Sequence, residues 1–271
     1  MESFPLETPG LIEVRGPDAV RFLNGQITQD ARNLGDATRA SCITDAKGRL
    51  QFYVEILQSP KADPCLWVAT RFDEREEILA RLDRYLIADD ASLEDLSGSW
   101  HRLRADSPGL PDANFSRTST WPEPNWRDYW FDFLPTSPAP APLSPTEIEE
   151  RRIRLGSPIW GREITAGLLP PEARLDTSAI SFSKGCYIGQ ETLSRIKSAG
   201  KLNRKLAPFQ VLGFLAAGDT FESDGIPCGT ITSVAPSGQY ALGFLHKSGF
   251  GKSHFTVTER PASQLTLKEK A

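Results

Sequence analysis

The chain contains few cysteines and histidines and has no long apolar run. Its four cysteines and three histidines are scattered, with no Cys-x-x-Cys pair, so the sequence predicts no metal site. No stretch approaches the roughly eighteen consecutive apolar residues of a membrane span, and the first residues lack the pattern of a secretory signal. We therefore expect a cytoplasmic protein without membrane contact or disulfides.

A general excess of positive charge is also absent. The net charge of −4 argues against a protein that coats nucleic acid. One segment departs from this balance, with six basic residues in twenty-two positions: Lys184, Arg195, Lys197, Lys201, Arg204 and Lys205. The segment is read as a solvated surface, as a site for a polyglutamate tail, or as a site for an RNA backbone.

The N-terminal part predicts strands that alternate with single helices. The expected strands are residues 11–14, 39–44, 50–57 and 66–70. The expected helices are residues 18–23 and 74–87, the second with a capping box from Asp73 to Glu76. This alternation favours an α+β domain with ferredoxin-like units.

The remaining chain predicts connectors, one helix and a barrel. Residues 106–125 and the proline-rich 134–145 are expected to be connectors, and a helix is expected over 146–155. Short apolar runs separated by turn residues, at 210–214, 229–234, 240–245 and 255–258, predict a small antiparallel β-barrel. The predicted domains are 1–205, with subdomains of about 1–104 and 125–205, and 206–271.

The segment richest in chemistry is Lys184-Gly185-Cys186-Tyr187-Ile188-Gly189-Gln190-Glu191. Gly185 gives the backbone next to Cys186 conformational freedom, and the positive charge of Lys184 favours the reactive thiolate form of the cysteine. The alternative is a buried cysteine that acts as a small apolar residue, which is the interpretation for Cys42, Cys65 and Cys228.

This segment resembles the signature Lys-Gly-Cys-Tyr-x-Gly-Gln-Glu of the YgfZ family of folate-binding proteins, which has mitochondrial relatives in iron–sulfur cluster assembly. All seven specified positions are met. The resemblance continues at residues 16–30, at the hairpin turn 45–49 and at residues 169–172.

The resemblance implies an α+β fold in which ferredoxin-like folate-binding subdomains form a ring, followed by the barrel. It implies tetrahydrofolate or a derivative as the ligand, with Cys186 and Lys184 as candidate catalytic residues. The candidate folate-binding residues are Asp45, Lys47, Glu172, Tyr187, Gln190, Glu191 and Arg195. The implied function is an accessory role in assembly or repair of iron–sulfur clusters, with reduced folate, the cluster machinery and transiently tRNA as partners. Cluster enzymes such as those that thiolate tRNA would depend on it.

Three positions, in two segments, depart from the related aminomethyltransferases. Those enzymes carry an acidic pair after the hairpin turn, where this chain has Gln51 and Phe52, and a pterin-binding glutamate where it has Arg154. A folate-dependent aminomethyltransferase or demethylase is therefore the second hypothesis. A folate-responsive RNA-binding scaffold is the third.

Overall fold

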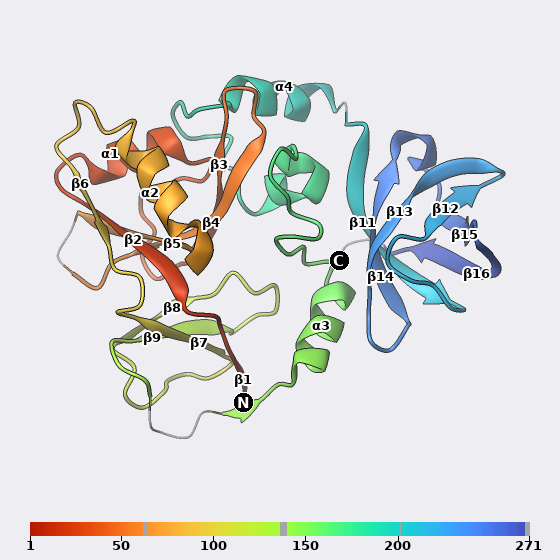
Figure 1. The fold of residues 1–271 in the computed structure, drawn as a ribbon, viewed down its shortest axis with the longest axis horizontal. Coiled ribbons are helices and arrows are strands. Elements are labelled where there is room, and N and C mark those ends of the chain that lie inside the picture. Colours follow the sequence, from red (N-terminus) through yellow and green to blue (C-terminus); the bar gives the residue numbers. More distant parts are fainter. Residues whose placement is uncertain (62–63, 136–139, 201, 269–271) are drawn as a thin grey trace. The chain divides into compact units, whose positions relative to one another are not determined.

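The structure is a computed structural model that describes residues 1–61, 64–135, 140–200 and 202–268. It contains two compact units (Figure 1). Unit 1 comprises Met1–Leu143 and Asp176–Thr192, and unit 2 comprises Ser144–Leu175 and Leu193–Ala271. The predicted domain boundary at residue 205 stays a prediction, because compact units need not fold separately.

Unit 1 contains an antiparallel sheet of five strands in the order β3-β4-β5-β2-β6. The bounds are β2 Pro9–Arg15, β3 Arg39–Thr44, β4 Leu50–Gln58, β5 Cys65–Arg71 and β6 Ser92–Asp95. Helices α1 (Ala19–Gln26) and α2 (Arg75–Asp83) cover one face, where Phe22 and Leu82 join the buried core that includes Val68.

A second sheet covers the other face of the first. Its order is β10-β1-β7-β9-β8, with β1 Glu2–Pro5, β7 His101–Ala105, β8 Phe115–Thr118, β9 Arg127–Phe131 and β10 Ala141–Pro142. Side chains alternate between the faces of a strand, so Val68 faces the helices whereas Trp67 faces the second sheet. The rings of Trp67 and Trp130 lie 5.6 Å apart in an edge contact.

Charged side chains are also buried between these sheets. Arg104 Nε donates to Asp128 Oδ1 over 2.6 Å, and Arg102 Nη1 donates to Glu55 Oε2 over 2.5 Å. Burial alone would raise the pKa of Glu55, but Arg102 and Arg104 outweigh it and lower the pKa to about 2. Glu55 is therefore ionised, and it ties β4 to β7.

Unit 2 contains a closed antiparallel barrel in the order β11-β14-β13-β12-β15-β16 (Figure 1). The bounds are β11 Arg204–Leu212, β12 Thr220–Ser223, β13 Ile226–Val234, β14 Tyr240–His246, β15 His254–Val257 and β16 Arg260–Leu267. Its core includes Phe209, Phe221 and Phe255, whose ring centroids lie 5.1–5.9 Å apart. The predicted α+β class and C-terminal barrel are confirmed.

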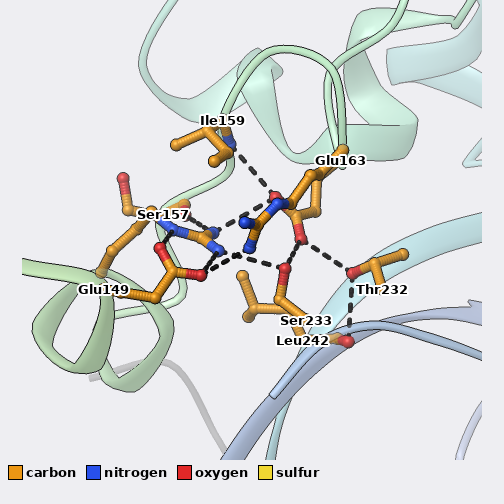
Figure 2. Close-up of polar contacts among 9 residues, drawn as sticks. Glu149, Ser157, Ile159, Glu163, Thr232, Ser233 and Leu242 are labelled. Carbon is orange, nitrogen blue, oxygen red and sulfur yellow. Dashed lines mark hydrogen bonds and ion pairs between the residues drawn. The ribbon is translucent and has the colours of Figure 1, made fainter. Parts of the chain in front are cut away.

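A buried carboxylate attaches the segment before the barrel to the barrel itself (Figure 2). Glu163 accepts hydrogen bonds from Ser233 Oγ at 2.6 Å, Thr232 Oγ1 at 2.9 Å, and Arg152 Nη1 and Ile159 N at 3.2 Å. Arg152 lies on helix α3 (Pro145–Arg154), and both hydroxyls belong to β13. The buried charge therefore has a cation and three further donors, which offset its loss of hydration.

The remaining helical elements are α4 Gln190–Ala199 and the 3-10 turns η1 Phe72–Glu74, η2 Pro170–Ala173, η3 Leu175–Thr177 and η4 Lys247–Gly249. In the part of the chain that the structure describes, no helix has the length and apolar content that crossing a bilayer requires.

Three local predictions need comment. The helix expected over 146–155 is confirmed as α3. The helix expected over 74–87 begins within one residue of the predicted start, at Arg75, but ends at Asp83, and the Asp73 carboxylate binds Arg71 instead of capping the helix. The connector expected over 106–125 contains β8, which pairs with β9, and residues 136–139 of the proline-rich connector lie outside the described residues.

We predict that Glu163→Ala destabilises unit 2 by about 1–3 kcal/mol, because Ser233 Oγ and Arg152 Nη1 would lose a buried acceptor while Arg152 keeps its ion pair with Glu149. The half-buried Glu150, which accepts hydrogen bonds from Ser237, supplies the control Glu150→Gln. This control should change stability by about 0.5 kcal/mol or less. Calorimetric unfolding of both variants measures the difference, and equal losses would contradict the prediction.

Candidate functional site

The motif lies on an irregular stretch of unit 1 whose backbone bonds to neighbouring segments. Residues 181–189 form neither helix nor strand. Ser181 N donates to Thr28 O over 3.0 Å, and Ile188 N donates to Gly25 O over 3.3 Å. Thr44 Oγ1 donates to Ile188 O over 2.6 Å. These contacts fix both ends of the stretch, which we call the motif loop.

Lys184 anchors the middle of the motif loop. Its side chain is 6% exposed, and Nζ donates to Ile27 O at 2.8 Å and Gln29 O at 2.7 Å. Burial lowers the pKa of Lys184 to about 7, although the carboxylate of Asp30 opposes this shift. Nζ also lies 5.1 Å from the ring centroid of Tyr187. The amine thus binds main-chain oxygens, and its predicted role as a catalytic cation stays a prediction.

Cys186 is exposed, whereas Cys42, Cys65 and Cys228 are buried as expected. Burial raises the pKa of Cys42 to about 12 and also raises the pKa of Cys65. A Cβ added to Gly185 would meet no atom within 4 Å, so the backbone next to the thiol is open. Among the four thiols, Cys186 has by far the best access to a partner or reagent.

Gly189 brings the hairpin turn against the motif loop. Its φ is +87°, and a Cβ there would lie 2.5 Å from Asp45 O and 2.7 Å from Thr44 Oγ1, so only glycine fits. Asp45 Oδ1 accepts the amides of Lys47 and Arg49, each at 2.8 Å, and thereby holds the turn. The predicted ligand residues Asp45 and Lys47 are therefore brought next to the motif.

Tyr187, Gln190 and Glu191 complete the predicted set in unit 1. The hydroxyl of Tyr187 is buried and has no hydrogen-bond partner among the described residues. Burial raises the pKa of Tyr187 to about 12. Gln190 N donates to Tyr187 O over 3.2 Å where α4 begins.

The last two predicted residues, Glu172 and Arg195, belong to unit 2, so their part in one site with the motif loop stays a prediction. Glu172 pairs with Arg204 at 3.2 Å. Of the basic segment, Lys184 is buried and Arg204 is paired, and Lys201 lies outside the described residues. The six basic residues between positions 184 and 205 therefore do not all form one exposed cationic surface.

Sequence reasoning missed the residues that support the site. Arg81 donates from Nη1 to Gln26 Oε1 at 3.0 Å and from Nε to Gln51 Oε1 at 3.3 Å. Thr28, fully buried, donates to Ala179 O over 2.7 Å. Thr28 lies within the resembling segment 16–30, which was the available signal. Among the described residues no group of three or more His, Cys, Asp or Glu side chains could hold a metal ion.

No sequence-family profile matches the chain, but individual proteins do. The tRNA-modifying protein YgfZ of Edwardsiella ictaluri is 26% identical and covers 94% of this chain and 88% of its own length. The mitochondrial iron-sulfur cluster assembly factor IBA57 homolog of Pyricularia oryzae is 27% identical over 82% of this chain. The chain is a homologue of the YgfZ and IBA57 proteins. It spans 61% of that IBA57 homolog's length.

A comparison with solved structures concerns the fold. The crystal structure of glycine cleavage system aminomethyltransferase T from Bartonella henselae superposes with a TM-score of 0.78 and 16% identity, covering 99% of this chain and 85% of that one. The α+β fold resembling that of aminomethyltransferases is thereby confirmed. The cellular compartment stays a prediction, since the matched IBA57 homologs are named mitochondrial.

The buried amine of Lys184 generates a prediction about pH. Unfolded lysine has a pKa of about 10.4, so above pH 7 the folded state, with a pKa of about 7, binds fewer protons than the unfolded state. Stability then rises with pH. Relative to Lys184→Met, the wild-type protein should gain about 2 kcal/mol between pH 7 and 9. Chemical unfolding of both proteins at each pH measures this gain, and parallel curves would contradict it.

Proposed function

We propose that this protein is an accessory factor in the assembly or repair of iron–sulfur clusters, that it binds reduced folate, and that it acts through Cys186. The observation that carries the proposal is the exposure of this one thiol, on a loop fixed at both ends, while the other three are buried. The names of the YgfZ and IBA57 homologues support the same role.

Thiolates hold iron–sulfur clusters, so an exposed cysteine on a fixed loop suits brief contact with a cluster as cargo. A single cysteine cannot supply all the ligands of a cluster, and the described residues offer no second ligand group. The remaining thiolates would come from a partner protein or from small thiols. Cys186 would therefore act in transfer or repair rather than in storage.

The polar groups of unit 1 fit the demands of reduced folate. A pterin needs fixed donors and acceptors, and its glutamate tail needs cations. The Tyr187 hydroxyl is buried without a partner among the described residues, and Asp45 uses mainly one carboxylate oxygen for its turn. Lys47 is an exposed cation on the same turn. When bound, the folate would supply or accept a one-carbon unit.

The aminomethyltransferase alternative gains no support from the residues at its acidic positions. Gln51 is neutral and accepts from Arg81, and Phe52 packs against the core between α1, α2 and the sheet. Without a carboxylate there, the chain lacks the group that those enzymes use at the folate nitrogen. The similarity to aminomethyltransferase T therefore supports a shared fold and not a shared reaction.

The link to tRNA is proposed to be indirect. The name of the YgfZ relatives refers to tRNA modification, and enzymes that thiolate tRNA are plausible clients because they need clusters. Direct RNA binding would need a continuous cationic surface. Here Lys184 is buried and Arg204 is paired with Glu172, which weakens the RNA-scaffold hypothesis.

We predict that Cys186→Ser folds normally and fails to support cluster enzymes. Because the Cys186 side chain is exposed, the free energy of unfolding of the variant should differ from that of the wild type by about 0.5 kcal/mol or less. Function should fail because the serine hydroxyl lacks the affinity of a thiol for soft metals. Thermal unfolding and complementation of a deletion strain, read as activity of a cluster-dependent enzyme, are measured on the same variant.

The matched control is Cys42→Ser, at a fully buried position. It should lose about 1–3 kcal/mol of stability because a buried hydroxyl would need a partner, yet complement when grown at low temperature. Full complementation by Cys186→Ser would end the thiol hypothesis.

We also predict that tetrahydrofolate binds and that Lys47→Gln weakens binding by about two- to five-fold, the range of an exposed ion pair. Added salt should reduce the difference between the two proteins. Arg84→Gln removes an exposed cation beyond the end of α2 and serves as the control with unchanged affinity. Isothermal calorimetry is the measurement, and no binding at millimolar ligand would refute the folate proposal.

A further inference from the structure

We propose that Lys184 is a positioning residue, whose buried amine holds the motif loop so that Cys186 is presented in one fixed orientation. The inference rests on the proposed function of Cys186 and assigns Lys184 a task other than charge stabilisation of the thiol. Its basis is the pair of hydrogen bonds from Nζ to Ile27 O and Gln29 O.

The support to which the amine binds is itself fixed. Thr28 lies between the two acceptor residues, its N–H donates to Cys42 O over 2.9 Å, and its Oγ1 accepts from Cys42 N over 2.9 Å. Gln29 N donates to Ser41 Oγ over 3.0 Å. Both carbonyls therefore belong to a segment that is hydrogen-bonded to strand β3. Through its two hydrogen bonds, the lysine side chain connects the motif loop to this sheet.

The position of Lys184 within the loop explains its effect on Cys186. The main-chain contacts lie at Ser181 and Ile188, three residues before and four after Lys184. Between these contacts, Gly185 permits wide backbone freedom because it lacks a Cβ. The two bonds from the lysine anchor the chain two residues before the sulfur, so that Gly185 is the single residue between this anchor and Cys186.

An electrostatic role would place different demands on this side chain. A cation that stabilises a thiolate acts best when its charge faces the sulfur. Here the amine is 6% exposed and points its hydrogens at main-chain oxygens, while Cys186 is exposed. A thiol that is already held in a productive orientation loses less entropy when it meets its partner. This advantage does not require a positive charge beside the sulfur.

The experiment uses a nitroxide attached to Cys186, which is the exposed cysteine among four. Its paramagnetic resonance spectrum reports motion of the loop. We expect a slow-motion spectrum in the wild-type chain and a rotational correlation time at least about two-fold shorter in Lys184→Met, since methionine fills the space without donating. Lys184→Gln, which can reach fewer acceptors, should also free the label.

Leu82→Ala, in the core of unit 1 on α2, is the control for lost stability. Compared at the same interval below each melting temperature, it should keep the wild-type spectrum. A wild-type spectrum in whichever of Lys184→Met or Lys184→Gln folds would overturn the positioning role.

Complementation separates this inference from the function on which it rests. Lys184→Met should reduce support of cluster enzymes several-fold, whereas Cys186→Ser should abolish it. Full complementation by Lys184→Met, with Cys186→Ser inactive, would overturn the inference and leave the thiol function standing. Full complementation by Cys186→Ser would overturn the function itself.

Discussion

The motif loop has no regular structure, so its polar main-chain groups depend on partners from elsewhere in unit 1. Buried main-chain groups that lack such partners cost as much as a lost hydrogen bond. Here Ser181 and Ile188 bond to the end of α1 and the segment after it, and Thr44 and Lys184 add side-chain donors. The exposed position of Cys186 is therefore set by the strands and helix beneath the loop rather than by the motif alone.

Two buried charged side chains in this protein are satisfied in opposite ways. Glu163 accepts hydrogen bonds from the cation of Arg152 and from three neutral donors. Lys184 donates to two main-chain carbonyls, Asp30 supplies an opposing charge, and burial lowers the pKa of Lys184 to about 7. A neutral amine still donates hydrogen bonds, so Lys184 can hold the loop without a full charge.

Much of the fold could be predicted because local patterns determined it. The hairpin of β3 and β4 was predicted within one residue, since two strand-like runs flank the polar turn at residues 45–48, which contains Gly48. Strand β8 was missed because its four residues are polar apart from Phe115, and only pairing with β9 makes them a strand. The helix α2 was overextended because Tyr85 and Leu86 keep the helical spacing after the helix has ended.

The sequence singled out the candidate residues of the motif loop, whose part in a site stays a prediction, but it did not show what their side chains contact. A cation two residues from a thiol suggests an electrostatic partner, but sequence spacing gives no direction to a four-carbon side chain. The acceptors of Lys184 lie 155 and 157 residues earlier in the chain, at Gln29 and Ile27. Main-chain acceptors so far away in the chain cannot be recognised from the sequence, because every residue has a carbonyl oxygen.

A shared fold and a changed site together account for the proposed chemistry. The framework matches an aminomethyltransferase over nearly the whole chain, yet Gln51 bonds to Arg81 where the enzymes carry acid. Folate affinity can survive this loss, because binding and proton transfer use different groups. In the proposed function, a folate site and the exposed thiol would be coupled through the motif loop. Gly189 makes this coupling steric, since it packs directly on the turn that contains Asp45. Any ligand that shifts the turn must therefore also move the stretch that presents Cys186.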